Sequence, residues 1–147
     1  MKIFVGADHN GFRLKEHIEH YLRSLNYDVK DVSGNKFDQD DDYPIHSAKV
    51  ASSVLATPDS VGILLCGSGQ GVCMSANRFK GIRASLVWNE AEARSSRNDD
   101  DANILCLPAR EFSRLDDAKQ IVDIWLNTPF GGAVRYTRRI KQMDQLT

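Results

Sequence analysis

The chain has 147 residues, about the length of one domain. Hydrophobic residues make up 41% and charged residues 27%, a composition that excludes a disordered chain, a collagen and a coiled coil. With 19 basic and 20 acidic residues the net charge is −1, so no overall positive field attracts a nucleic acid or an anionic membrane. We expect neither as a partner, and any anion site must be local.

The predicted elements alternate along the chain between short apolar runs and segments with helical spacing. Strands are predicted at residues 3–6, 28–32, 61–66, 83–88 and 103–107. Helices are predicted from Gly11, from Pro44, over 72–77, 89–97 and 115–126, and from about residue 134. This alternation predicts one α/β domain over residues 1–147, a three-layer α/β/α, Rossmann-like sandwich around a five-stranded parallel sheet.

Neither a membrane segment nor an oxidised cysteine pair is expected. The apolar run 61–66 is far shorter than the roughly 20 residues of a membrane helix, and the start MKIFVGAD becomes polar too early for a signal peptide. The three cysteines, Cys66, Cys73 and Cys106, contain no CxxC pair, which argues against a disulfide framework and a zinc site. The sequence therefore predicts a cytoplasmic protein without a bound metal.

The most distinctive motif is CGSGQG at residues 66–71, between a predicted buried strand and a helix. Its three glycines allow several backbone N–H groups to converge at a helix N-terminus, where they can hold an oxyanion or a phosphate. The same field favours the thiolate of Cys66, which would suit a base or nucleophile. A tight strand-to-helix turn, with Cys66 as a small buried hydrophobic residue, explains the pattern equally well.

Other interpretations of this loop and of the acidic runs fit the spacing poorly. Val72 stands where a dinucleotide fingerprint requires glycine and where a cysteine phosphatase would have arginine, and the loop has no GxSxG nucleophile elbow. The runs 40–42 and 99–101 lack the spacing of a calcium loop, so we predict solvated loops there.

Further candidate residues lie near the ends of other predicted strands. Asp8 and His9 directly follow the first strand, and the carboxyl ends of parallel strands are where ligands bind. Arg110 follows the fifth strand, while Arg135 and Arg139 share one face of the last helix. Guanidinium groups suit phosphate, although a solvated basic helix is the simpler explanation of the last pair.

Taken together, these motifs resemble the ribose-5-phosphate isomerase B / galactose-6-phosphate isomerase family along nearly the whole chain. The resemblance rests on GADHNGF at 6–12, DYP at 42–44, CGSGQG at 66–71, ANRFKGIR at 76–83, NIL at 103–105 and the glycine pair 131–132 before the two arginines.

The resemblance implies isomerisation of a phosphosugar between aldose and ketose through an enediolate, without metal or cofactor. Cys66 would move the proton between C1 and C2, with Ser68 and the turn residues Gly67, Gly69, Gln70 and Gly71 holding the oxyanion and the substrate. Substrate binding would also involve Asp8, His9 and Tyr43, and phosphate binding would involve Arg110, Arg135 and Arg139. It further implies a homodimer or tetramer with shared active sites, in which a helix at about 134–145 reaches the neighbouring subunit.

One departure concerns the residues before the fifth strand. The family commonly has His-Asn there, with the His assisting ring opening and the Asn contacting substrate, whereas this chain has Asp99 and Asp100. We expect Asp99 to act as acid or base and Asp100 to contact substrate, or ring opening to use another group, such as His46 or water. A sugar of different size or stereochemistry, or a non-catalytic sugar-phosphate-binding protein on the same fold, is the alternative.

Overall fold

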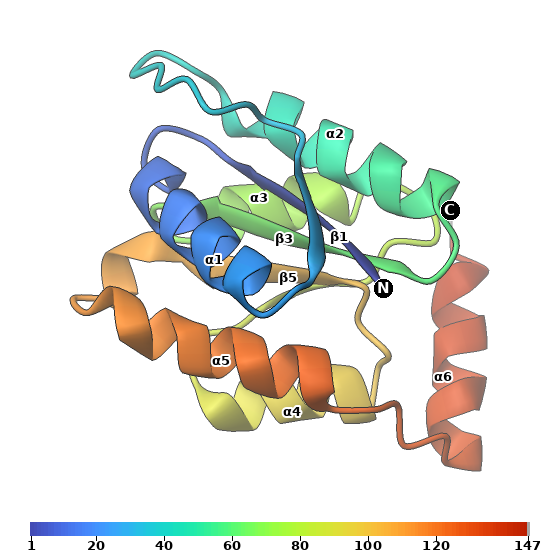
Figure 1. Cartoon of the computed structure of the whole chain (residues 1–147). Helices are drawn as coiled ribbons and strands as arrows, with labels where there is room; N and C mark the ends of the chain where they lie inside the picture. Colours follow the sequence, from blue (N-terminus) through green and yellow to red (C-terminus); the bar gives the residue numbers. More distant parts are fainter. Residues whose placement is uncertain (147) are drawn as a thin grey trace.

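A computed structural model describes residues 1–146 and contains one parallel sheet of five strands covered on both faces (Figure 1). The strands, in the order β2-β1-β3-β5-β4, are β1 (Lys2–Ala7), β2 (Asp28–Asp31), β3 (Ser60–Cys66), β4 (Ala84–Leu86) and β5 (Ile104–Pro108). The helices are α1 (Phe12–Ser24), α2 (Tyr43–Ala56), α3 (Gln70–Ala76), α4 (Glu90–Asn98), α5 (Leu115–Asn127) and α6 (Val134–Asp144), with a short 3₁₀ helix η1 (Ala109–Glu111). The predicted fold class is confirmed.

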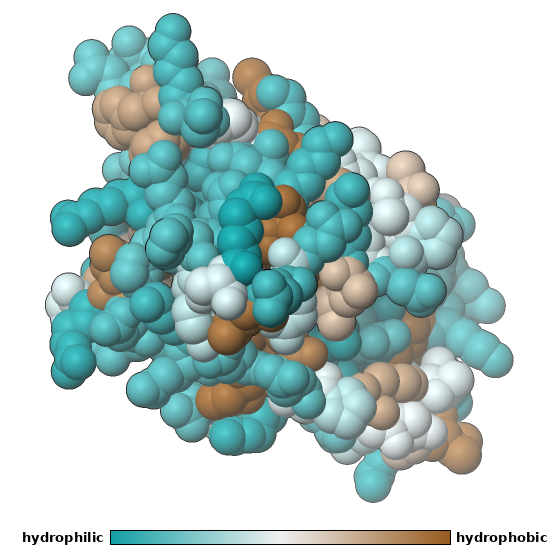
Figure 2. All heavy atoms as spheres, in the orientation of Figure 1, coloured by the Kyte–Doolittle hydropathy of each residue, from teal (hydrophilic) through white to brown (hydrophobic). Residues whose placement is uncertain are grey.

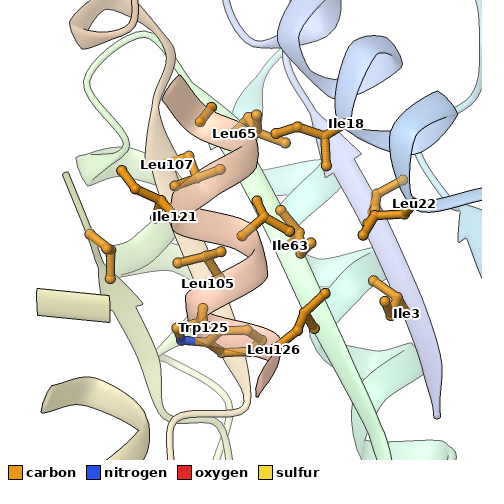
Figure 3. Packing of buried hydrophobic residues seen from close by; sticks show 14 of the residues in the cluster. Ile3, Ile18, Leu22, Ile63, Leu65, Leu105, Leu107, Ile121, Trp125 and Leu126 are labelled. Carbon is orange, nitrogen blue, oxygen red and sulfur yellow. The ribbon is translucent and has the colours of Figure 1, made fainter. Parts of the chain in front are cut away.

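Two hydrophobic layers hold the sheet between its helices. Every residue of β3 is buried, which explains why this central strand is a continuous apolar run rather than an alternating one. Ile63 and Leu65 point toward α1 and α5, where Trp125 is fully buried (Figure 3). Leu64 and Cys66 belong to the second layer, beneath α2 and α3. The central strand is thereby fixed from both sides, and so is the point at which it ends.

The fourth strand is shorter than predicted, three residues instead of six. Before it, the backbone N–H of Arg83 donates to Asn103 Oδ1 at 2.8 Å instead of pairing within the sheet. After it, the Val87 N–H still donates to Cys106 O of β5 at 3.0 Å, and Asn89 then caps α4, accepting a hydrogen bond from the Glu92 N–H at 2.9 Å. Side-chain hydrogen bonds at both ends therefore limit this edge strand.

Helix α6 stands apart from the sheet, near the end at which β1 begins (Figure 1). None of its residues is buried, and its contact with the rest of the chain includes an ion pair of Arg83 with Asp144 at 4.0 Å.

The surface seen in Figure 2, in the same orientation, has mostly hydrophilic side chains with scattered hydrophobic groups. Within residues 1–146, no helix has the length and apolar character needed to cross a membrane.

Candidate active site

The loops after β1 and β3 lie side by side at the carboxyl edge of the sheet. β1 pairs with β3 so that Ala7 lies opposite Leu65, and the Asp8 N–H donates to Leu65 O at 3.4 Å. The chain passes from β1 to β2 on one side and reaches β3 on the other, which makes this the position where open parallel sheets bind ligands. Asp8 and Cys66 are therefore neighbours at this edge, as the sequence predicts.

The turn that carries His9 is pressed against the end of β3. A Cβ atom on Gly11 would come within 2.6 Å of Leu65 O, so only glycine permits this approach. Asp8 is 5% exposed, and its Oδ1 accepts hydrogen bonds from the N–H groups of Asn10 at 3.0 Å and Gly11 at 3.2 Å. One oxygen of Asp8 therefore shapes the turn that presents His9.

The glycine turn begins directly after Cys66. Gly69 adopts a φ of 73° and caps α3, which starts at Gln70. The Gln70 N–H donates to Ser68 Oγ at 3.3 Å, whereas the N–H groups of Gly67, Ser68 and Gly69 have no acceptor among the described residues. These groups are available to a bound anion. Cys66 is itself 5% exposed, as expected for a small buried hydrophobic residue. It also lies at the base of this turn, as expected for a base or nucleophile.

Arg110 in η1 and Tyr43 at the start of α2 cover the glycine turn. The Arg110 N–H donates to Gly67 O at 3.0 Å, and a Cβ on Gly67 would lie 2.6 Å from Arg110 Nη2. A Cβ on Gly71 would lie 2.5 Å from Cε1 of Tyr43. Small residues are therefore required at both positions for the guanidinium and the phenol ring to come this close. The structure thus brings a cation and a hydroxyl-bearing ring to the turn.

Asp41, in the loop before α2, joins His9 in the turn after β1 to His46 in α2. Asp41 Oδ1 accepts from both the His9 N–H at 2.9 Å and His9 Nδ1 at 2.8 Å, while Oδ2 lies 2.8 Å from His46 Nε2. The hydrogen bond with Asp41 raises the pKa of His9 above its ordinary value of 6.5. Burial alone would raise the pKa of Asp41, but its hydrogen bonds with the two histidines outweigh this and lower it.

The prediction of a solvated loop at residues 40–42 is wrong for Asp41. This residue is half-buried, although Asp40 and Asp42 on either side are exposed. Sequence reasoning missed Asp41, because a run of three aspartates does not show which one turns inward, and it considered His46 only as an alternative. Within residues 1–146 no group of three or more His, Cys, Asp or Glu side chains is arranged to hold a metal ion.

The remaining predicted residues lie at the opposite edge of the sheet. Ile104 pairs with Gly62, so Asn103 is level with Val61, about 16 Å along the strand from Cys66. The loop before it is tied to Arg83, whose Nε donates to the backbone oxygens of Asp100 at 3.0 Å and Asp101 at 3.1 Å. Asp99 and Asp100 therefore do not reach Cys66 within one chain.

Charges from α6 gather at this second edge. Burial raises the pKa of Asp100, the adjacent Asp99 raises it further, and the cations of Arg139 and Arg83 oppose both effects. Arg135 and Arg139 are exposed on α6. Asp99, Asp100 and the two arginines thus belong to one end of the molecule, and the glycine turn with Asp8, His9, Tyr43 and Arg110 belongs to the other. A site using both groups requires two chains.

An α/β sandwich with a glycine turn and a cysteine at its carboxyl edge is the arrangement expected for the predicted class of sugar isomerase, and comparison with known proteins agrees. The sequence profile of the Ribose/Galactose Isomerase family matches residues 3–143. The chain belongs to this family. The resemblance seen in the motifs is thus confirmed, and with it the expected enzyme class, an aldose–ketose isomerase.

Individual relatives share most of the chain. A probable ribose-5-phosphate isomerase B from Mycoplasma genitalium is 42% identical over 142 residues, covering 96% of this chain and 92% of that protein. Ribose-5-phosphate isomerase B from Escherichia coli is 37% identical, covering 99% and 95%.

Solved structures show the same fold. A ribose 5-phosphate isomerase from Thermotoga maritima has a TM-score of 0.93 at 41% identity, covering 99% of this chain and 98% of that one. The Mycoplasma genitalium ribose-5-phosphate isomerase B with bound ribulose-5-phosphate has a TM-score of 0.92 at 41% identity, covering 98% and 94%.

Proposed function

We propose that this protein interconverts an aldose phosphate and its ketose, ribose 5-phosphate and ribulose 5-phosphate in the first instance, with Cys66 as the base. The observation that carries the proposal is the position of Cys66 beside Asp8 and directly before Gly67, which Arg110 covers, in a turn with three N–H groups that have no acceptor among the described residues. The relative with bound ribulose-5-phosphate supports the substrate class.

The proposed chemistry is a proton transfer between two adjacent carbons. The Cys66 thiolate removes the proton from C2 of the open-chain aldose, the carbonyl oxygen on C1 takes the electron pair, and an enediolate forms. The thiol then returns the proton to C1. The C2 hydroxyl gives up its own proton, which passes to the C1 oxygen through water, so C1 ends with a hydroxyl group and C2 with the carbonyl. Oriented N–H donors such as those of Gly67 and Gly69 stabilise the oxyanion, at about 3 kcal/mol for each well-placed donor.

A shared site accounts for the two separated groups of residues. We infer a homodimer or tetramer in which α6 of one subunit brings Arg135 and Arg139 to the glycine turn of its neighbour, where Arg110 already lies. Three guanidinium groups would then surround the phosphate. Asp99 and Asp100 would enter the same site from the neighbour, where they would act as hydrogen-bond acceptors for sugar hydroxyls. The enzyme would act in the cytoplasm and use no metal or cofactor.

Catalysis by Cys66 is tested with purified protein and a panel of phosphosugars that includes ribose 5-phosphate and galactose 6-phosphate. Turnover of at least one member should fall about 10²–10⁴-fold in Cys66→Ala, the usual contribution of a positioned base. Cys73→Ala is the matched control, because Cys73 lies on α3 outside the turn, and it should retain activity within about threefold. Tight binding without turnover across the panel would instead identify a sugar-phosphate-binding protein.

The shared site is tested by mixing subunits. Cys66→Ala lacks the base at the glycine turn, and Arg139→Ala lacks a phosphate ligand on α6, so both homo-oligomers should be much less active than wild type at substrate concentrations below KM. A mixed dimer of the two has one site with both defects and one site with neither, so each mixed dimer should have about half of the wild-type activity. A random equimolar mixture, in which about half of the dimers are mixed, should recover about a quarter of it. A monomer in sedimentation, or no recovery after mixing, would contradict the arrangement.

A further inference from the structure

His9 lies at the carboxyl edge of the sheet, the edge at which β3 ends with Cys66. Ala7 pairs with Leu65, which places His9 two residues beyond the last pair of strand residues, beside the glycine turn. Its Nδ1 is bound to Asp41, whereas its Nε2 has no hydrogen-bond partner among residues 1–146. The side chain is 31% exposed, so the ring is held on one side and open on the other.

Asp41 is held in turn by His46. His46 is buried, with Nε2 at 2.8 Å from Asp41 Oδ2, and its Nδ1 is buried without a partner in the described part of the chain. A proton on that Nδ1 would be a buried unpaired donor, which is costly, so the favoured tautomer carries its proton on Nε2 and donates it to Asp41. The Asp41 carboxylate is thereby fixed at both oxygens, Oδ1 by His9 and Oδ2 by His46.

We propose that Asp41 and His46 are positioning residues that hold the His9 imidazole as the proton donor for opening the sugar ring. This inference rests on the proposed function and adds a step that precedes the chemistry at Cys66. Pentose 5-phosphates are cyclic in water, and the carbonyl group at C1 forms only when the ring opens. In that step the C1–O bond to the ring oxygen breaks and His9 Nε2 gives its proton to that oxygen. The hydroxyl on C1 loses its proton to water, and His9 takes one back from water.

The charges around His9 support this role. Asp8 in its own turn and Asp40 and Asp41 in the loop before α2 are all carboxylates, and together with the Asp41 hydrogen bond they raise the pKa of His9. The protonated ring therefore persists to higher pH than an isolated histidine would. No charged group from another element is among the causes that act on it.

The experiment separates ring opening from proton transfer between carbons. Net conversion of ribose 5-phosphate requires ring opening, whereas ribulose 5-phosphate is acyclic, because its O5 carries the phosphate. Incorporation of deuterium from D₂O at C1 of ribulose 5-phosphate therefore reports the enediolate step alone. In Asp41→Asn we expect net conversion from the aldose to fall about tenfold or more, with deuterium incorporation within about threefold of wild type. The limb of the pH profile on which activity falls with rising pH should move to lower pH.

Matched variants distinguish positioning from packing. Asp40→Asn removes a neighbouring exposed carboxylate that does not touch His9, and it should leave both rates within about twofold. His46→Leu should behave as Asp41→Asn does, and His46→Gln, which keeps an N–H near the Nε2 position, should recover most of the loss. Equal loss of conversion and deuterium incorporation, or no loss of either, would overturn the proposal. Absence of both rates in the wild-type protein would instead contradict the proposed function.

Discussion

The guanidinium of Arg110 lies over the backbone of Gly67 so closely that a Cβ on that glycine would approach Nη2 to 2.6 Å. The same two residues are joined by a hydrogen bond from the Arg110 N–H to Gly67 O at 3.0 Å. The position of a cation therefore depends on the absence of one side chain. A side chain introduced at Gly67 should therefore displace the guanidinium of Arg110, which is a proposed phosphate ligand.

Gly67→Ala should move the Arg110 guanidinium and weaken substrate binding about tenfold, with a smaller effect on the free energy of unfolding. Arg110→Ala should weaken binding by a similar factor, because a phosphate contact is lost. Since both changes act on the same cation, the double variant should be little worse than either single one. The measurement is KM for the sugar phosphate in a double-mutant cycle, and fully additive losses would contradict the coupling.

The left-handed residue Gly69 should be far less tolerant of substitution than Gly34. Both have positive φ, 73° and 89°, so alanine at either costs about 1–2 kcal/mol in backbone strain. A Cβ on Gly69 would also lie 2.5 Å from Leu86 Cδ1 and 3.0 Å from Pro108 N, whereas nothing lies within 4 Å of one on Gly34. Urea denaturation should show a loss of about 3 kcal/mol or more for Gly69→Ala. Equal losses at the two positions would show that the contacts are relieved by movement.

Lys15 should contribute strongly to stability despite its charge. It is fully buried, and its Nζ donates to Asp31 Oδ2 at 2.6 Å, Gly34 O at 2.6 Å and Ser33 Oγ at 3.3 Å. Lys15→Met leaves the Asp31 carboxylate buried without its counter-ion, which should cost about 3–5 kcal/mol.

Lys2→Met is the control for Lys15, because the Lys2–Asp28 pair is exposed and 3.9 Å long. Thermal unfolding should show that Lys2→Met lowers the free energy of unfolding by less than about 1 kcal/mol. A comparable loss for both lysines would mean that the buried pair is no stronger than a surface one.

The His9 titration should report its contact with Asp41 directly. NMR should give His9 a pKa above 6.5 in the wild-type protein and a lower pKa in Asp41→Asn, because the largest cause of the rise is the hydrogen bond with Asp41. Because the pKa of His9 is raised on folding, its contribution to stability is complete below pH 6.5 and is lost as the pH rises through the folded value. The lowered pKa of Asp41 adds stability above pH 3.8 that is lost as the pH falls through its folded value.

The two signs together define a pH window for the same pair. The free energies of unfolding of wild type and Asp41→Asn should differ most between about pH 3.8 and 6.5, and less above the folded pKa of His9. Chemical denaturation at several pH values measures this difference, and a difference independent of pH would contradict it.

Much of the fold was predictable because local patterns and tertiary structure agree. The apolar run ending at Cys66 is the central strand, and the helical spacing after Leu115 is a helix with Trp125 on its buried face. The exception is the fourth strand, whose ends are set by the side chains of Asn89 and Asn103. A hydrogen bond such as that between Arg83 and Asn103 joins residues distant in sequence, so the local sequence pattern does not predict it.

The candidate site was predictable only in part, for a topological reason. Residues that follow a parallel strand share one edge, so Asp8, Cys66 and Arg110 could be grouped from the sequence alone. Asp99 precedes a strand and therefore lies at the other edge, which the resemblance alone did not reveal. Asp41 was missed because burial within an acidic run depends on how the loop folds back onto His9.

Helix α6 contacts the rest of the chain without burying any of its own residues. Packing therefore places few constraints on the sequence of α6. Changes at Arg135 or Arg139 should alter the surface charge of the helix without disturbing the sheet. Under the proposed shared site, variation along this helix would change phosphate binding while leaving the free energy of unfolding of the single chain nearly unchanged.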